Sequence, residues 1–186
     1  MKDVWLISDT HFTHRNIIGF TREDGTPLRP FKSVEEMDEA LVENWNSVVK
    51  PNDVVYHLGD VVINRSALPI LGRLNGRKKL IRGNHDIFKT REYLPYFEEI
   101  FGSYKLSNYI LTHIPIHPES IARWANGNIH GHLHANVVMK EVHYRGEYSD
   151  YDTILKVDDS RYTCVSVEQI NYTPIHLDDI INTTRV

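Results

Sequence analysis

Five short apolar runs lie along the chain, and each is followed directly by a polar motif. The runs cover residues 4–7, 54–56, 79–81, 109–111 and 128–129. Nearly continuous apolar strands are typical of a sheet that is covered on both faces. Because ligands bind beyond the carboxyl ends of the strands in open α/β sheets, we expect all five polar motifs to lie along one edge of one sheet.

Helical patterns separate these runs. The clearest covers residues 33–50, where apolar side chains recur at helical spacing from Val34 to Val48. Ser33 and Glu36 predict a capping box at its start, and Pro51 predicts its end. Shorter helices are predicted at residues 66–73, 89–94 and 120–125. The alternation of strands and helices predicts an α/β fold.

The pattern changes after His134. Residues 137–148 and 162–172 alternate or are β-branched, which predicts antiparallel strands. Residues 147–159 are rich in Ser, Tyr and Asp and indicate an exposed loop, and a short helix is expected within residues 174–182. Since no repeat or linker interrupts the 186 residues, we expect a single domain over residues 1–186.

Composition narrows the functional classes. The net charge is −4 and the pI about 6.2, so a broad electrostatic contact with nucleic acid is not expected, and nucleic acid enters only as a possible substrate. One cysteine, Cys164, excludes an intrachain disulfide and favours a reducing compartment. The apolar start of the chain is too short for a signal peptide or a membrane span. We therefore expect a cytoplasmic protein with no membrane partner; the sequence leaves its oligomeric state open.

The polar motifs contain more metal ligands than one ion needs. Carboxylate, imidazole and amide groups suit zinc, manganese and iron, and two such ions form a clamp for in-line displacement at phosphorus. His132 and His134 would share one face of an extended strand, aimed at one cavity. A single histidine at a strand end is usually only a hydrogen-bonding residue, and a structural zinc site would normally use several cysteines. The number of ligands favours a phosphoester hydrolase with two metals.

The order of the motifs resembles the calcineurin-like metallophosphoesterase superfamily, and in particular its small, single-domain prokaryotic or viral members. The family pattern of D-x-H, G-D, G-N-H-[DE], H and G-H-x-H is present in that order, from Asp9 to His134. The resemblance implies a four-layer α/β/β/α sandwich in which two sheets face each other. The antiparallel tail would then supply the second sheet.

The resemblance also implies roles for individual residues. It places Asp9, His11 and His134 on one metal, Asn84, His113 and His132 on the other, and Asp60 between the two. The two divalent ions would be Mn, Fe, Zn, Ni or Mg. Hydroxide between them would attack phosphorus, and His85, which is not a ligand, would protonate the leaving oxygen.

One departure from the family bears on the substrate. The protein phosphatases of this superfamily carry Asp-Arg-Gly shortly after the G-D motif, where this chain has Ile63-Asn64-Arg65. A protein-phosphatase role is therefore disfavoured, and Asp86 is one option for the group that orients His85. The leading interpretation is a metal-dependent phosphatase or phosphodiesterase, with a diester of a small or nucleotide-like substrate favoured.

Two alternatives remain open beside this interpretation. One is a metal-bound interaction scaffold without chemistry, although the catalytic histidine and all seven ligand positions are present. The other is a nuclease, against which the acidic balance argues. Candidates for contact with the phosphoester are His14, Arg15, Arg82 and Arg123, although most arginines only solvate a surface. His57 is interpreted as a core residue rather than as a residue that orients a ligand.

Overall fold

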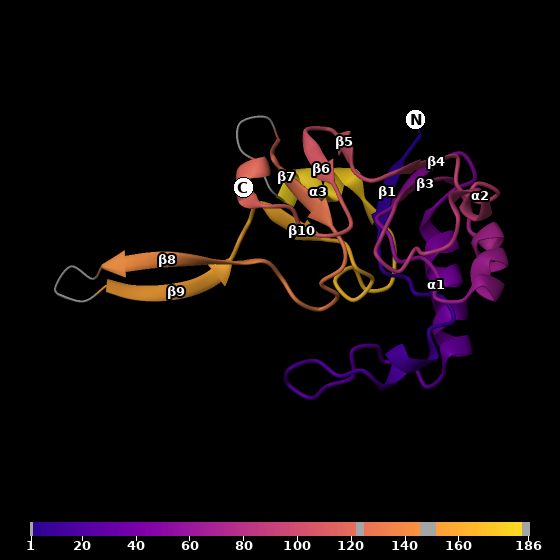
Figure 1. Cartoon of the computed structure of the whole chain (residues 1–186), viewed down its shortest axis with the longest axis horizontal. Helices are drawn as coiled ribbons and strands as arrows, with labels where there is room; N and C mark the ends of the chain where they lie inside the picture. Colours follow the sequence, from indigo (N-terminus) through magenta and orange to yellow (C-terminus); the bar gives the residue numbers. More distant parts are fainter. Residues whose placement is uncertain (1, 122–124, 146–151, 184–186) are drawn as a thin grey trace.

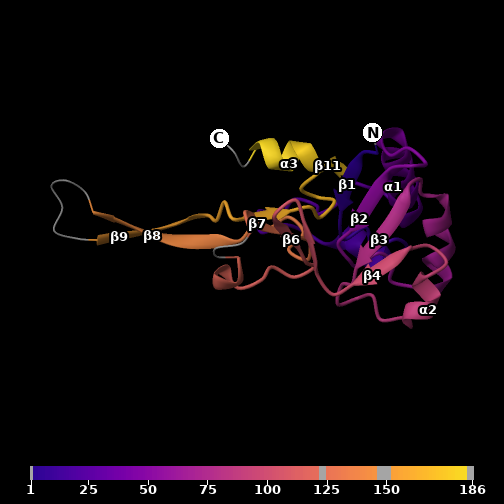
Figure 2. The same ribbon diagram turned by 90° about the horizontal axis from the view of Figure 1, so that it is seen from above.

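A computed structural model describes residues 2–121, 125–145 and 152–183 of the chain. Two sheets and their helices form the body, and a two-stranded ribbon extends away from it (Figure 1, Figure 2). The α/β class expected from the alternation of strands and helices is confirmed. Across these residues no helix is both long and apolar enough to cross a membrane.

The first sheet has five strands in the order β11-β1-β2-β3-β4. β1 (Val4–Ile7), β2 (Val54–His57), β3 (Arg77–Ile81) and β4 (Glu99–Phe101) are parallel, and β11 (Ile175–His176) pairs with β1 in the antiparallel sense. The strands that precede the first three motifs are therefore neighbours, and their carboxyl ends lie at one edge.

The second sheet has four strands in the order β10-β7-β6-β5. β6 (Tyr109–Leu111), β7 (Gly127–His130) and β10 (Tyr162–Cys164) are parallel, and β5 (Tyr104–Leu106) is antiparallel to β6. The expectation of one edge of one sheet was wrong, because the last two motifs follow strands of this second sheet. The two edges still meet, since Ser8 N–H donates to Val165 O at 2.9 Å.

Helices cover the outer face of the first sheet. They are α1 (Val34–Val48), the 3₁₀ helix η2 (Arg65–Arg73) and the short α2 (Thr90–Tyr93). Their side chains Leu41, Leu71 and Tyr93 pack with Ile7 and Leu80 of the sheet. Ser33 caps α1 by accepting a hydrogen bond from Glu36 N–H at 3.1 Å. The other half of the predicted capping box is displaced by one residue, because Glu36 accepts from Lys32 N–H.

A second core lies between the two sheets. Leu6 and Ile81 come from the first sheet and meet Leu111 and Ile129 of the second. The C-terminal helix α3 (Leu177–Thr183) adds Leu177 to this core. Two further 3₁₀ helices, η1 (Arg15–Gly19) and η3 (Pro118–Ser120), lie in connections. The two facing sheets agree with the expected sandwich.

The C-terminal third differs most from the expectation. Residues 152–158 were assigned to a loop but form strand β9 (Asp152–Asp158), paired with β8 (Met139–Arg145) in a separate ribbon. The antiparallel tail therefore does not supply the second sheet. The strand expected at 162–172 is only β10, and the helix expected at 120–125 falls partly on residues 122–124, outside the described residues.

Candidate metal centre

The loops that follow β1 and β2 hold the first motifs in a left-handed backbone conformation. Asp9 has φ 57°, His11 has φ 47° and Asp60 has φ 58°. Such a conformation is strained for residues other than glycine and persists only where the surroundings impose it. Here the two loops are bonded to each other: Asp9 N–H donates to Gly59 O and His11 N–H to Asp60 O, both at 3.0 Å. The strained backbone positions are therefore those of the candidate ligands themselves.

Asp9, His11 and His134 form one candidate ligand group. One possible ligand atom from each lies within 4.8 Å of the others. Oδ2 of Asp9 accepts hydrogen bonds from His132 N–H at 2.9 Å and from Ser166 Oγ at 2.8 Å. Oδ1 of Asp9 is buried and has no hydrogen-bond partner. Because a buried carboxylate oxygen is normally paired, this atom fits a bound cation.

His113 is the centre of a second group. Its Nδ1–H donates to Leu58 O at 2.7 Å, which directs Nε2 into the site. That Nε2 lies 2.9 Å from Oδ1 of Asn84 and 3.3 Å from Oδ2 of Asp60. The ring of His132 lies edge-on to the His113 ring, with 5.2 Å between the ring centroids. Asp9, Asp60 and His113 each offer a ligand atom within 4.8 Å of the others, and Asn84 and His132 lie beside His113.

Asp60 joins the two groups. Its Oδ2 lies 3.6 Å from Nε2 of His11 and 3.3 Å from Nε2 of His113, whereas its Oδ1 accepts a hydrogen bond from His85 N–H at 2.8 Å. Burial alone would raise the pKa of Asp60, but His113 and the His85 N–H hold it at about 2. Asp60 is therefore a carboxylate, and it presents one oxygen to both groups.

Asp86 fixes the loops around Asp60. Its Oδ2 accepts from the N–H groups of Asp60 and Gly83, each at 2.8 Å, and its Oδ1 accepts from Val61 N–H at 3.0 Å. Burial raises the pKa of Asp86, against the effect of these three donors. Since both carboxylate oxygens are used by the backbone, Asp86 is not the group that orients His85.

Two residues that the sequence did not single out support His134. Glu168 Oε1 accepts from His134 Nδ1–H at 3.0 Å and from Arg29 Nε at 2.8 Å. Arg29 is fully buried and also donates to the backbone oxygens of Thr10 and Asp9. No local motif marks this pair, because Arg29 and Glu168 are 139 residues apart. Such a partner fixes the ring orientation and tautomer of a metal-binding histidine.

His132 and His134 belong to a turn and not to an extended strand. Their φ angles are 69° and 52°, and they contribute to different groups, so the expectation of one shared face was wrong. The backbone of Gly131 packs directly against Ser8 and Asp9. A Cβ atom at this position would overlap Ser8 Oγ and Asp9 Oδ2, so the turn requires glycine here.

His57 is a core residue, as its position suggested. It is completely buried, and burial lowers its pKa to about 3. Its Nδ1 accepts from Gly59 N–H at 3.2 Å, and its Nε2–H donates to Thr10 Oγ1 at 3.0 Å. Both ring nitrogens are thereby used, so the neutral ring supports the loop after β2 and offers no atom to a metal.

His85 and His14 both lie beside the ligand groups. The exposed His85 has its ring centroid 5.6 Å from that of His11. The ring of His14 lies between His11, at 5.5 Å, and Phe20, at 5.8 Å. The structure thus brings the predicted proton donor and one predicted substrate contact beside the same candidate ligand, His11.

Of the three arginines proposed as substrate contacts, the structure describes Arg15 and Arg82, and Arg82 lines the cavity beside Asn84 and His113. Arg15 is exposed and pairs with Glu35 of α1 at 3.8 Å. Arg82 donates to Asp86 O at 2.7 Å and to Phe88 O, so its guanidinium holds its own loop together. Arg123 lies outside the described residues.

The chain is similar to a known protein family and to several known proteins. The model of the calcineurin-like phosphoesterase family matches residues 2–185. An uncharacterized protein of Methanocaldococcus jannaschii is 38% identical over 97% of this chain and 90% of its own length. The Gene 66 protein of Mycobacterium phage L5 is 35% identical over 46% of this chain and 41% of its own. A solved structure of a protein of unknown function from Aquifex aeolicus has 29% identity and a TM-score of 0.66, covering 98% of this chain and 100% of that one.

Proposed function

The chain belongs to the calcineurin-like phosphoesterase family, and we propose that it is a dinuclear-metal phosphoesterase that hydrolyses phosphodiesters of small or nucleotide-like alcohols. The observation that carries the proposal is the position of Asp60 Oδ2, at 3.6 Å from one candidate metal ligand, His11, and 3.3 Å from the other, His113. One carboxylate oxygen between two sets of ligands is suited to two cations and has no evident use with one.

Each group holds a distinct set of donors. In this proposal Asp9, His11 and His134 would hold one cation. Asn84, His113 and His132 would hold the other, with Asp60 between the two sets and Asp9 close enough to Asp60 and His113 to reach the second cation as well. When bound, the two cations supply the positive charge that stabilises the attacking and leaving oxygens of an in-line displacement at phosphorus. The mixture of carboxylate, imidazole and amide ligands is compatible with Mn, Fe, Zn, Ni or Mg.

His85 has the proton-transfer role in this proposal. It is exposed, and its backbone N–H is fixed by Asp60 Oδ1. The ring is held beside the centre without being a candidate ligand, and so is free to donate a proton to the leaving oxygen. The group that orients the ring comes from the substrate or from solvent in this scheme, because Asp86 is committed to the backbone.

Two cavities support a diester over a monoester. One of about 540 Å³ adjoins His132 and His134, and another of about 380 Å³ adjoins Asn84 and His113. A phosphodiester carries two organic groups, and each of the two cavities adjoins ligands of the candidate centre and could receive one. A monoester would use only one of them.

The test combines metal content with turnover. Purified protein with Mn²⁺ is expected to bind two ions per chain and to cleave bis(p-nitrophenyl) phosphate, with turnover abolished by a chelator. Asp60→Ala is expected to lose metal and activity, and His85→Ala to keep metal while losing most of its activity. Arg15→Ala, at an exposed surface pair, is the control and keeps both.

The outcomes separate this proposal from its rivals. Full activity of Asp60→Ala contradicts it. Two bound metals with no turnover of any monoester, diester or cyclic nucleotide identify a scaffold. Cleavage of short DNA with no turnover of small diesters identifies a nuclease.

A further inference from the structure

We propose that the larger cavity is a nucleoside pocket in which Phe20 stacks on the base of a nucleotide ester. This inference rests on the proposed function, because it names the organic group that is attached to the phosphorus. It concerns residues 19–28 and 132–136, of which only His132 and His134 belong to the candidate metal centre.

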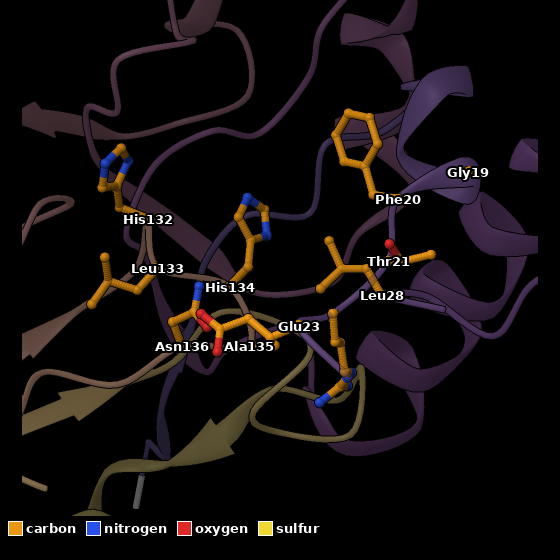
Figure 3. A pocket seen from close by; sticks show the side chains of 11 residues that line it. Gly19, Phe20, Thr21, Glu23, Leu28, His132, Leu133, His134, Ala135 and Asn136 are labelled. Carbon is orange, nitrogen blue, oxygen red and sulfur yellow. The ribbon is translucent and has the colours of Figure 1, made fainter. Parts of the chain in front are cut away.

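The cavity lies between two segments that are far apart in the sequence. Residues 19–28 form one wall, and the turn that carries His132 and His134 forms the other (Figure 3). Its volume of about 540 Å³ is within the range of small-molecule sites, roughly 300–1,000 Å³. A ligand in this cavity therefore lies against ligands of both candidate metals.

The wall formed by residues 19–28 is built before a ligand arrives. Thr21 and Pro27 form an isolated antiparallel bridge, and Leu28 N–H donates to Phe20 O at 2.8 Å. The tip is closed by Asp24, whose Oδ1 accepts from Thr26 N–H at 2.9 Å. A pre-organised wall loses little conformational entropy on binding.

Phe20 supplies a surface for stacking. Its side chain is 47% exposed although it is large and apolar. Its ring and that of His14 are perpendicular, with the ring planes at 89°. Figure 3 shows the Phe20 ring on the side of the cavity opposite His132. Stacking of a base on an exposed aromatic ring in a groove is a frequent mode of nucleotide recognition.

The spacing suits a sugar between phosphate and base. The ring centroid of His14 lies 5.5 Å from that of the candidate metal ligand His11 and 5.8 Å from that of Phe20. With a phosphate at the metals and the base at Phe20, the sugar would lie in the cavity between the turn that carries His134 and Phe20.

The remaining lining is mixed, as a base requires. Leu28, Leu133 and Ala135 give apolar surface, while Arg22, Glu23 and Asn136 offer donors and acceptors for the edges of a base. A purely aliphatic alcohol would form no hydrogen bonds with these exposed polar groups. The lining therefore favours a nucleoside over an alkyl group, and the experiment below compares the two.

The test uses two substrates with the same leaving group. Thymidine 5′-(p-nitrophenyl phosphate) retains a nucleoside on the phosphorus, and methyl p-nitrophenyl phosphate retains only a methyl group. Phe20→Ala is expected to raise the KM for the thymidine ester about tenfold, the order of one lost base–aromatic stack. The KM and kcat for the methyl ester are expected to change less than twofold.

Two further variants control the result. Phe20→Trp keeps an aromatic surface and is expected to restore the low KM for the thymidine ester. Leu94→Ala removes an exposed apolar side chain far from the cavity and is expected to change neither substrate. Equal effects of Phe20→Ala on both substrates, or no effect on either, would overturn the proposal.

A binding measurement separates this inference from the proposed function. Thymidine 5′-monophosphate is titrated into chelator-treated wild-type and Phe20→Ala protein and followed by calorimetry. Binding that weakens about tenfold in Phe20→Ala supports the pocket even if no ester is hydrolysed. If the protein hydrolyses the methyl ester but Phe20→Ala behaves like the wild type in both the kinetic and the calorimetric assay, the proposed phosphoesterase function is supported and the nucleoside pocket is refuted.

Discussion

Replacing Asp86 tests whether the backbone around Asp60 is held by one buried carboxylate. Asp86 is 2% exposed and accepts three hydrogen bonds from backbone N–H groups, two of which, at Asp60 and Val61, belong to fully buried residues. In Asp86→Ala all three donors lose their acceptor. An unsatisfied buried donor costs about 1–3 kcal/mol.

The expected loss of stability is smaller than the sum of three such costs. Water can enter the space left by a carboxylate and satisfy some of the donors. Burial raises the pKa of Asp86, which means that burying its charged form is unfavourable, and Asp86→Ala no longer has a charge to bury. We therefore expect Asp86→Ala to lower the free energy of unfolding by about 3–5 kcal/mol.

Asp86→Asn gives a graded comparison. Its one amide oxygen can replace Oδ2 and accept from Asp60 and Gly83, while its NH₂ group then faces Val61 N–H. One bond is lost rather than three, so about 1–2 kcal/mol is expected. Since the Asp60 loop also shifts, Mn²⁺ affinity is expected to fall about 10–100-fold in either variant.

The assay is urea unfolding followed by tryptophan fluorescence in the presence of a chelator, with Mn²⁺ binding measured separately. Asp24→Asn is the matched control, because Asp24 also accepts from a backbone N–H but is exposed, and a change within about 0.5 kcal/mol is expected. A loss below about 1 kcal/mol in Asp86→Ala, with unchanged Mn²⁺ affinity, would refute the assignment of Asp86 as the residue that positions Asp60.

Three further predictions follow from the same structure. Glu168→Gln leaves the buried Arg29 without its counter-charge and weakens the hydrogen-bond acceptor for His134. The free energy of unfolding is therefore expected to fall by about 3–5 kcal/mol and the Mn²⁺ affinity by about 10–100-fold. An unchanged urea midpoint together with an unchanged Mn²⁺ affinity would contradict this prediction. Burial raises the pKa of Asp38 to about 6, so the folded state binds the proton of this carboxyl more tightly than the unfolded state does. The contribution of Asp38 to wild-type stability is therefore expected to decrease as pH rises from about 4 to about 6. Asp38→Asn, which keeps an acceptor for Thr13 N–H, is expected to lack this decrease of at most about 3 kcal/mol, and parallel stability curves for the two proteins would show that Asp38 does not titrate in that interval. Adding Mn²⁺ at about 100 times its dissociation constant is expected to stabilise the wild type by about 2.7 kcal/mol in urea unfolding, whereas Asp60→Ala gains nothing.

The strands and the longest helix were predictable because their apolar periodicity is local. Residues 54–56 and 79–81 fall within β2 and β3, and the apolar stripe from Val34 to Val48 is α1. The C-terminal ribbon was not predictable in the same way. β9 exposes Ile154, Leu155 and Val157 and is stabilised by its pairing with β8, so the sequence shows no alternation between a buried and an exposed face.

The candidate ligands were identified from motifs, but their arrangement was not. Assignment of the motifs to one sheet failed because strand length and composition do not say which sheet a parallel strand joins. Arg29 and Glu168 were missed for a related reason. Each is an ordinary charged residue in the sequence, and only the tertiary fold brings them within 2.8 Å of each other.

The residues in the left-handed conformation explain why the geometry of the site could not be predicted from the sequence. They also explain how the fold holds the candidate ligands in position. Asp9, His11, Asp60, His132 and His134 all have φ between 47° and 69°, a region that costs about 1–3 kcal/mol for each non-glycine residue. Aspartate and histidine are enriched among the non-glycine residues of this region, but no propensity scale predicts which of them adopt it. The cost is met by bonds between loops of different strands, such as Asp9 N–H to Gly59 O and His132 N–H to Asp9 Oδ2. Because these bonds involve no metal, the ligands are held near their final positions by the fold itself, and cation binding is spared much of the ordering cost.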